Sequence, residues 1–331
     1  MAELSRREFL SAAAACGAVL AVGGVPGRLE AARLAALPAR RATVVRAPWA
    51  RIDRVADGVW AVVSDMSGDR TTYCNGAIVR GQGRTLVLEA YATAQGAAWV
   101  AEQAQLLTGR WPDDGVITHK HFDHVDGAAA YAARGGRPAP RLHATDTTIE
   151  AVRKVEVGRS GGPDPVKLGV LDAHVPIDPA RPTKLDLGRG GPKCTIIPLK
   201  GHTLSDVVVE LEDPDVIMAG DLVQNGAFPW FGDAVPSAFA PSLRSLRRDR
   251  ATRYITGHGD PGGPEVLERY IALLELIERT ARDAHARGEA AEETAQRFVI
   301  PESLAIPKPP PMAVRVAFTA WAKELSGGPA T

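Results

Sequence analysis

The chain has 331 residues, of which 45% are hydrophobic, and is therefore long enough for one or two globular domains with a sizeable core. Its 39 basic and 39 acidic side chains cancel to a formal net charge of zero. Because proteins that bind a phosphate backbone usually carry a basic field, this balance disfavours a nucleic-acid partner.

A pair of arginines, Arg6 and Arg7, lies near the start of the chain and is followed by a weakly apolar run over residues 11–25. Residues 5–10 resemble the twin-arginine export signal, which implies passage through the twin-arginine machinery to the periplasm or the exterior. An uncleaved signal would leave the protein tethered to the membrane, and an ordinary N-terminal helix is the alternative. Because no cleavage site stands out and residues 28–46 read as a linker, we predict a signal and linker over residues 1–45.

Strand and helix signals alternate through the rest of the chain, which predicts an α/β fold. Residues 51–55 and 59–63 flank the sequence Ala-Asp-Gly and are typical of a hairpin. The other predicted strands are 72–79, 85–88, 115–118, 141–144, 194–199, 206–211, 216–219 and 254–256. The predicted helices are 94–107, 147–157, 264–277, 290–298 and 314–325.

Four metal-ligand side chains lie within six positions just after the predicted strand 115–118, at His119, His121, Asp123 and His124. Alternate side chains of an extended backbone share a face, so His119 and His121 are expected to point the same way. Asp123 and His124 fall at the turn into the next helix. Imidazole and carboxylate ligands without a nearby cysteine suit zinc, iron, manganese or nickel, so the cluster alone leaves the metal open.

This cluster resembles the His-x-His-x-Asp-His signature of the metallo-β-lactamase superfamily of hydrolases. Three later residues resemble the family's single ligands, namely His202 in Gly-His-Thr, Asp221 in Gly-Asp and His258 in Gly-His-Gly. The resemblance implies two divalent metal ions, of which zinc is expected and iron or manganese are alternatives. It assigns one ion to His119, His121, His202 and Asp221, and the second to Asp123, His124, His258 and the shared Asp221.

The resemblance also implies a fold, a four-layer αβ/βα sandwich over residues 46–262 with a helical C-terminal extension over residues 263–331. Aspartate at position 221 is similar to glyoxalase II and the lactonases, whereas β-lactamases of this fold usually have cysteine or a non-ligand there. An antibiotic-degrading role is therefore disfavoured.

The same resemblance implies a reaction in which hydroxide held between the two ions cleaves an ester, lactone, thioester or amide. All seven ligands are then also the catalytic residues. Three alternatives stay open, namely a mononuclear iron oxidoreductase like the sulfur dioxygenases, a β-lactamase, and a non-catalytic metal-binding accessory protein. The oligomeric state is not predicted.

Residues around the ligands carry further expectations. Glu89 stands where the family usually has aspartate, and it is expected to reach the same partner beside the metal loop. Asp206 either bonds a ligand or caps a strand. The aromatic residues Phe228, Trp230 and Phe231 form one wall of the pocket or pack into the core, and the first interpretation predicts a small-molecule substrate with an apolar portion.

The remaining cysteines and histidines are expected to be structural. Cys74 and Cys194 are predicted to be buried free thiols, although a disulfide is an alternative in an oxidising compartment. His143, His174 and His285 lie outside every motif.

Overall fold

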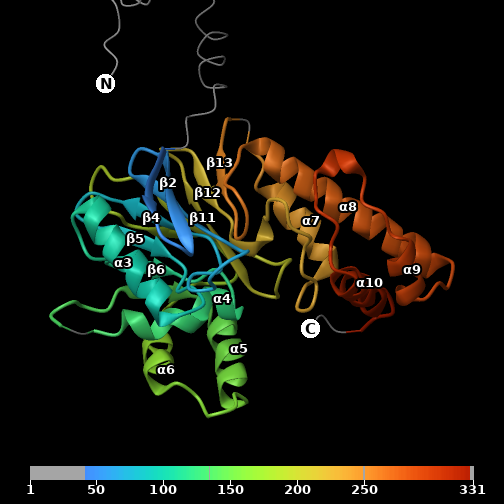
Figure 1. Cartoon of the computed structure of the whole chain (residues 1–331), viewed down its shortest axis with the longest axis horizontal. Coiled ribbons are helices and arrows are strands. Elements are labelled where there is room, and N and C mark those ends of the chain that lie inside the picture. The colour runs from blue at the N-terminus through green and yellow to red at the C-terminus, as the bar shows by residue number, and fades with distance from the viewer. Residues whose placement is uncertain (1–41, 134, 249, 329–331) are drawn as a thin grey trace, which may run out of the picture. The chain divides into compact units, whose positions relative to one another are not determined.

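The computed structural model describes residues 42–133, 135–248 and 250–328, which belong to one compact unit (Figure 1). Two sheets form its centre. The larger has eight strands in the order β1 to β8, antiparallel from β1 to β5 and parallel from β5 to β8. Its strands are β1 (Ala42–Arg46), β2 (Ala50–Ala56), β3 (Val59–Ser64), β4 (Gly76–Arg80), β5 (Thr85–Leu88), β6 (Asp114–Val116), β7 (Arg141–Ala144) and β8 (Val175–Pro176).

The second sheet has five strands in the order β13, β12, β11, β10, β9. They are β9 (Thr183–Leu185), β10 (Cys194–Leu199), β11 (Asp206–Leu211), β12 (Val216–Met218) and β13 (Arg253–Ile255). Only β12 and β13 pair in parallel, so that these two described strands have their carboxyl ends at the same edge.

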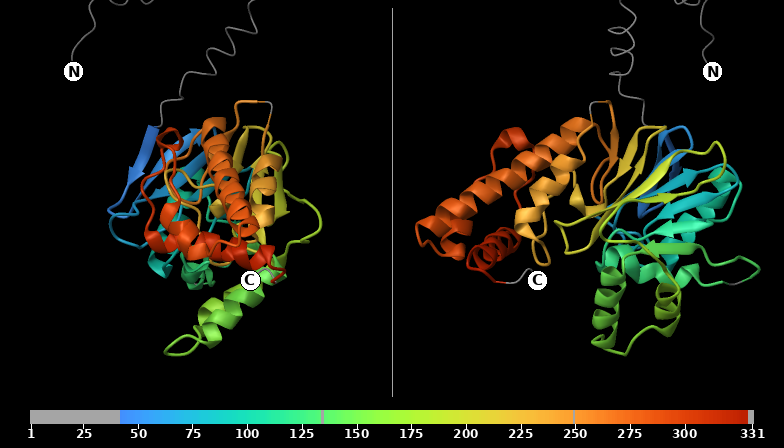
Figure 2. Two further views of the ribbon diagram at one scale, coloured as in Figure 1. Left: turned by 90° about the vertical axis from the view of Figure 1, so that its right-hand side faces the viewer. Right: turned by 180° about the vertical axis from the view of Figure 1, so that it is seen from behind.

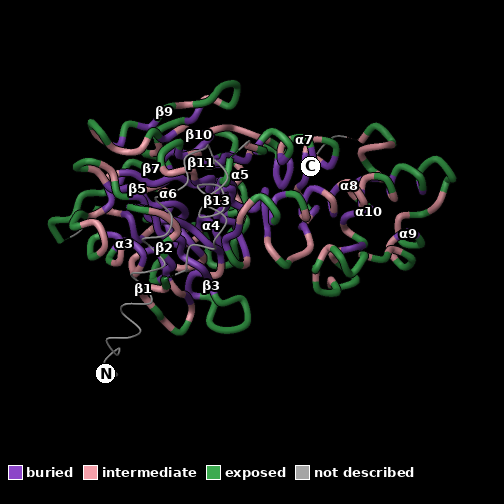
Figure 3. The backbone as a smooth tube through the Cα atoms, turned by 90° about the horizontal axis from the view of Figure 1, so that it is seen from above, coloured by how far each residue is buried: buried purple, intermediate pink, exposed green. Residues whose placement is uncertain are grey.

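Side chains that alternate along the strands bury the two sheets in three cores. Val59, Ala61 and Val63 of β3 face a core shared with Val207 and Val209 of β11, which is the interior between the sheets. The opposite face of the larger sheet packs on α3 (Ala94–Thr108), η1 (Asp126–Tyr131) and α5 (Asp146–Val157). The opposite face of the smaller sheet packs on α7 (Pro236–Ser245), α8 (Pro264–Ala286) and α10 (Pro311–Leu325). The expected four-layer sandwich is confirmed, and Figure 3 shows most of its central strands as buried, in purple.

The C-terminal residues form a helical layer, as predicted. Along α8 the buried positions include Val266, Tyr270, Leu274 and Ile277, the spacing of one helix face. α8 and α10 lie side by side, with α9 (Ala291–Arg297) and η3 (Glu302–Leu304) between them in the chain (Figure 2). The domain boundaries at 45 and 262 stay predictions.

A buried ion-pair cluster ties the segment after the metal loop to α5 and α6 (Pro165–Asp172). The Lys167 side chain is 2% exposed, and its Nζ donates to Glu156 Oε1 at 2.9 Å and to Asp126 Oδ1. Arg159 Nη2 lies 2.7 Å from Asp126 Oδ2 and 2.8 Å from Glu156 Oε1. Each buried charge thus has an opposite charge beside it, which offsets the cost of burial.

Several element boundaries differ from the prediction, and α8 continues to Ala286, beyond the predicted end at residue 277. Residues 42–46 were expected in a linker but form β1, because they pair with β2 along the edge of the sheet. The second strand pair begins at Gly76 rather than at residue 72. α10 begins at Pro311, inside the proline-rich stretch, since proline is tolerated at the first helical position. The twin-arginine segment lies outside the described residues, and none of the helices that the structure describes is long and apolar enough to cross a membrane.

Candidate metal centre

All seven predicted ligands stand just past strand ends. His119 and His121 follow β6, and Asp123 and His124 lie in the short helix α4 (Phe122–Val125). His202 follows β10, Asp221 lies in η2 (Gly220–Leu222) after β12, and His258 follows β13.

Two glycines allow the loops to approach closely. Gly220 has φ +51°, a left-handed conformation that glycine adopts without strain. A Cβ at Gly257 would lie 1.9 Å from Asp221 Oδ1, so only glycine lets the last ligand loop pass beside this carboxylate.

The first group of ligands, which we call the first cluster, is His119, His121, His202 and Asp221. Nδ1 of His121 lies 3.1 Å from Nε2 of His119 and 2.8 Å from Nε2 of His202. Asp221 Oδ2 is 3.5 Å from Nε2 of His202. Three imidazole nitrogens and a carboxylate oxygen therefore converge on one point.

The second cluster is Asp123, His124 and His258. Asp123 Oδ2 lies 3.3 Å from Nε2 of His258 and 3.6 Å from Nε2 of His124. Asp221 reaches this cluster as well, with Oδ1 3.3 Å from Nε2 of His124 and Oδ2 3.3 Å from Nε2 of His258. One carboxylate thus stands between the two clusters.

The side chains fit divalent metal ions. His124 Nε2 and Asp221 Oδ1 are buried and have no hydrogen-bond partner, which is costly unless something else occupies the space between them. Burial and the neighbouring histidines hold the pKa of His119 well below its usual range, and burial lowers the pKa of His202 to about 3. These imidazoles are therefore neutral, which is the form that binds metal.

The second cluster favours positive charge. Burial alone would lower the pKa of His258, but the carboxylates of Asp221 and Asp123 outweigh it and raise the pKa to about 9. The pKa of His124 is likewise raised well above its usual value, because negative groups that include Glu89 outweigh burial. The surroundings that retain a proton there are equally suited to a cation. The geometry fits a metal site without fixing which metal it is.

Carboxylates behind the ligands orient two of the histidines. Glu89 Oε1 lies 3.1 Å from Nδ1 of His124, so the longer side chain reaches the expected partner. It also accepts a 2.7 Å hydrogen bond from Thr118 Oγ1. On the other side, Asp233 Oδ2 lies 2.9 Å from Nε2 of His121. In both cases the outer nitrogen of the imidazole faces a carboxylate, which leaves the inner nitrogen to the cluster.

Sequence reasoning missed the role of Asp233, although an acid just after the aromatic loop was a visible signal.

Asp206 was expected either to bond a ligand or to cap a strand, and its contacts show its role. Its carboxylate accepts hydrogen bonds from Thr203 N at 3.1 and 3.0 Å and from Thr203 Oγ1 at 2.7 Å. It therefore braces the loop that carries His202, and burial raises its pKa to about 7.

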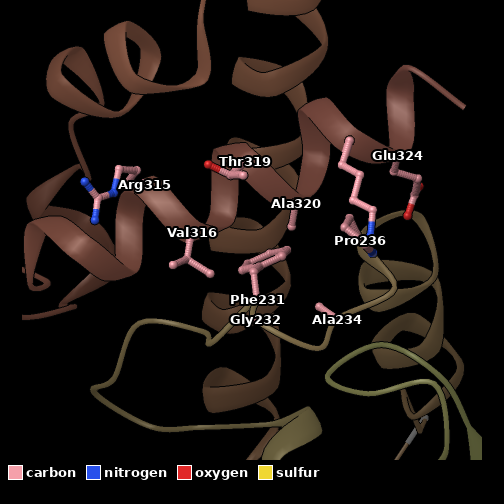
Figure 4. A pocket seen from close by; sticks show the side chains of 10 residues that line it. Phe231, Gly232, Ala234, Pro236, Arg315, Val316, Thr319, Ala320 and Glu324 are labelled. Carbon is pink, nitrogen blue, oxygen red and sulfur yellow. The ribbon is translucent and has the colours of Figure 1, made fainter. Parts of the chain in front are cut away.

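The aromatic loop contributes less to the pocket than expected. Phe231 is 1% exposed and packs on Phe239 of α7, while Phe228 packs against Phe298 at ring centroids 6.4 Å apart. Figure 4 shows Phe231 facing Val316 and Ala320 of α10, across a cavity of about 330 Å³. The prediction of a pocket wall is wrong for these two residues, because the C-terminal helices give them an apolar surface to cover.

Other side chains form an apolar surface beside the second cluster. Phe122 is 52% exposed and lies over Tyr73, with ring centroids 5.9 Å apart. The Tyr73 ring in turn meets the His258 ring edge-on at 6.4 Å. Met66 is 45% exposed, and its Sδ lies 3.3 Å from Nδ1 of His258. We call Met66, Tyr73 and Phe122 the apolar platform. The sequence did not predict this platform, because these residues share no motif.

The residues expected to be structural behave so. Cys74 and Cys194 are free and buried. His143 bonds Asp114 at 2.9 Å, His174 bonds Asp146 at 2.9 Å, and His285 is exposed in the last turn of α8.

Sequence comparison finds relatives over the part of the chain that carries these ligands. A metallo-beta-lactamase type 2 of Bacillus sp. (strain 170) is 30% identical over 167 residues, and one of Bacillus cereus is 28% identical over 166 residues. Each match covers 49% of this chain and 57% of the relative, so the alignment spans little more than half the length of these enzymes.

Solved structures share the fold. The metallo-beta-lactamase from Pontibacter korlensis has a TM-score of 0.54 at 19% identity, covering 68% of this chain and 99% of that one. The enzyme from Erythrobacter litoralis has the same score and identity, covering 70% and 98%. The family profile described as Lactamase_B, metallo-beta-lactamase superfamily, matches residues 70–258, which is more than half of the sequence and contains every ligand named above. The chain belongs to the metallo-beta-lactamase superfamily.

Proposed function

We propose that the protein is a zinc-dependent hydrolase that uses two metal ions to cleave an ester, lactone, thioester or amide. The observation that carries this proposal is the position of Asp221, whose carboxylate lies within 3.5 Å of histidine nitrogens from both clusters. Iron and manganese are the alternative metals, because the ligand set contains imidazole and carboxylate alone.

Such ions, when bound, polarise a carbonyl and lower the pKa of coordinated water to about 7. The chain's own residues then have distinct tasks. Asp233 and Glu89 fix the orientation of His121 and His124. Asp123, which is buried beside His258, would orient the attacking water by accepting a hydrogen bond from it. The closely packed loops exclude bulk water, which strengthens each electrostatic interaction inside.

The apolar platform suits a small-molecule substrate with an apolar portion. Two of its side chains are about half exposed, and soluble proteins gain by covering such a surface when a ligand binds. Tyr73 adopts φ +67°, a strained conformation for this residue type that is typical of ligand-binding sites. We assign the platform to the leaving group of the substrate, because it adjoins His258 and a metal ion held by the second cluster would stabilise the leaving group.

Export is part of the proposal. The twin-arginine resemblance of residues 5–10 supports transfer of the folded protein to the periplasm or the exterior by the twin-arginine machinery. Replacing Arg6 and Arg7 together by lysine should leave the protein in the cytoplasmic fraction. Unchanged export of that variant would contradict this part.

Cleavage of β-lactams is the second candidate, supported by the names of the two Bacillus relatives. Asp221 argues against this candidate, because enzymes with that activity usually have cysteine or a residue that binds no metal at this position. A mononuclear iron oxidoreductase and a metal-binding accessory protein are the further alternatives.

One experiment separates these functions. Elemental analysis of the purified protein is followed by assays with chromogenic ester, lactone, thioester and β-lactam substrates, and Asp221→Ala is the matched variant. The proposal predicts about two zinc ions per chain and hydrolysis that Asp221→Ala abolishes together with bound metal. A single iron per chain, or tight metal binding without hydrolysis of any substrate, would overturn it.

A further inference from the structure

A cavity lies beside two of the loops that carry ligands of the first cluster, although none of the seven ligands lines it. It has a volume of about 340 Å³ and lies between α5 and the loops that carry His121 and His202. Lys120 lines it from the position before His121, and Thr203 from the position after His202. Lys120 Nζ lies 2.5 Å from Asp233 Oδ1, and the other oxygen of Asp233 bonds His121. One carboxylate therefore separates the cavity wall from a predicted metal ligand.

The buried hydroxyls of this wall already have partners. Thr203 Oγ1 donates to Asp206 Oδ1 at 2.7 Å, and Thr148 Oγ1 donates to the Ser205 carbonyl at 3.2 Å. Ser205 Oγ lies 2.5 Å from Thr145 Oγ1. A hydroxyl that already forms a hydrogen bond inside the protein contributes little to a new polar contact, so the wall does not favour a polar ligand.

The charges at the cavity also cancel. Lys120 is paired with Asp233, as described above. Glu150 and Lys154, which line the side formed by α5, have opposite charges and are four residues apart on one helix face. With Lys120 paired, one acidic and one basic side chain remain along the α5 side, so the formal charges at the cavity balance and favour a neutral group.

Apolar side chains form the remaining surface. Leu204 is 44% exposed and Val155 is 61% exposed, and both line the cavity together with Ala151. Leu204 belongs to the His202 loop and Val155 to α5, so the two come from opposite walls. A ligand between them would bury both.

We propose that this cavity, which we call the acyl subsite, binds a neutral alkyl chain on the acyl side of the substrate. The inference rests on the proposed function and specifies its substrate class. The cavity lies beside the loops of the first cluster, whose metal ion would polarise the substrate carbonyl, and the apolar platform adjoins the second cluster, so the proposal places the scissile bond between two apolar arms. The substrate is thus an ester, thioester, lactone or amide of an aliphatic acid.

The volume limits the length of the chain. Burying one methylene changes binding by about fourfold. Small-molecule sites span about 300–1,000 Å³, so a cavity of about 340 Å³ accepts an alkyl chain of limited length. The value of kcat/KM should rise with the length of the acyl chain and then become constant once the cavity is full.

The test measures kcat/KM of the metal-loaded protein for p-nitrophenyl acetate, butyrate and hexanoate, which share one leaving group. The expected gain is about fourfold per added methylene until the cavity is full. Leu204→Asn should lower the hexanoate-to-acetate ratio about fourfold or more, the contribution of one methylene. Ala151→Trp, which fills the cavity, should remove the preference for hexanoate. Leu106→Asn is the matched control, because this leucine is 76% exposed on α3 and outside the cavity.

Failure of this inference is distinguishable from failure of the proposed function. Ester hydrolysis with a ratio that neither variant changes would overturn the acyl subsite and leave the hydrolase intact. If none of the ester, lactone, thioester and amide substrates is cleaved, the hydrolase is wrong, and NMR of the Leu204 and Ala151 methyl groups decides the subsite. Hexanamide should shift these signals and acetamide should not, whereas equal responses to both amides would overturn the subsite.

Discussion

Replacing Glu89 by glutamine tests whether the carboxylate behind the second cluster controls metal affinity. Glu89 is 3% exposed and has two functions, since it faces His124 Nδ1 at 3.1 Å and accepts hydrogen bonds from Thr118 at 2.7 and 3.3 Å. Glutamine keeps the volume but removes the charge and one acceptor. The substitution affects the two contacts differently, because only the contact with His124 is coupled to metal binding.

The magnitude follows from the charge of Glu89 beside His124 and from its hydrogen bonds to Thr118. Removing the partner behind a metal-binding histidine lowers metal affinity about 10- to 100-fold, and a hydrogen bond between neutral groups contributes about 0.5–1.5 kcal/mol. Loss of the charge therefore weakens the contact with His124 by about 1–1.5 kcal/mol, which corresponds to about a tenfold loss of affinity at the second cluster. Loss of an acceptor for Thr118 lowers the free energy of unfolding by about 1 kcal/mol in the metal-free protein too.

The assay is a zinc titration of the metal-free protein in competition with a chromophoric chelator, analysed with two sites. Glu102→Gln, an exposed change on α3, is the matched control and should leave both affinities unchanged. If Glu89→Gln bound both ions as tightly as the unchanged protein, the role of Glu89 in orienting His124 would be refuted.

Three further changes test other parts of the account. Asp233→Asn should weaken the first site about tenfold in the same titration, because His121 loses its carboxylate partner, and an effect confined to the second site would contradict the assignment. Met66→Leu removes the thioether beside His258 and should weaken the second site only a few-fold, since sulfur is a weak acceptor; a loss as large as that for Glu89→Gln would be inconsistent with this reasoning. Glu156→Gln should lower the free energy of unfolding by about 3 kcal/mol at pH 7, because it breaks the buried ion-pair cluster. Burial would raise the pKa of Glu156, but its hydrogen bonds and the cations beside it outweigh burial and lower the pKa below 4.5. The carboxylate therefore stabilises the fold above pH 4.5 and loses this effect as the pH falls through its lowered pKa, so urea unfolding should show the difference from the unchanged protein shrinking under acid conditions.

The order of strands and helices was readable from the sequence because most elements are bounded by strong local signals. The hairpin at Gly58 and the helix that ends at Gly109 are examples, since both glycines adopt positive φ. β1 was missed because residues 42–46 alternate between exposed and half-buried positions at the sheet edge, where the hydrophobic pattern is weak.

The candidate site was predictable to the extent that its residues lie in motifs. The structure brings the seven ligands together, and their catalytic roles stay predictions. Met66 and Tyr73 were not predictable, because each acts across a contact between segments that are distant in sequence. Asp233 was visible as an acid after the aromatic loop, but its contact with His121 was not. Phe231 was misjudged because the loop after Asp221 runs between the metal centre and α10, and sequence alone does not say which side an aromatic ring will face.

Anomalous X-ray diffraction at the zinc absorption edge, on crystals of the metal-loaded protein, tests the two-metal centre most directly. We predict two peaks on either side of the Asp221 carboxylate, one among the nitrogens of the first cluster and the other beside Asp123, His124 and His258. A single peak, or peaks away from these side chains, would contradict the account.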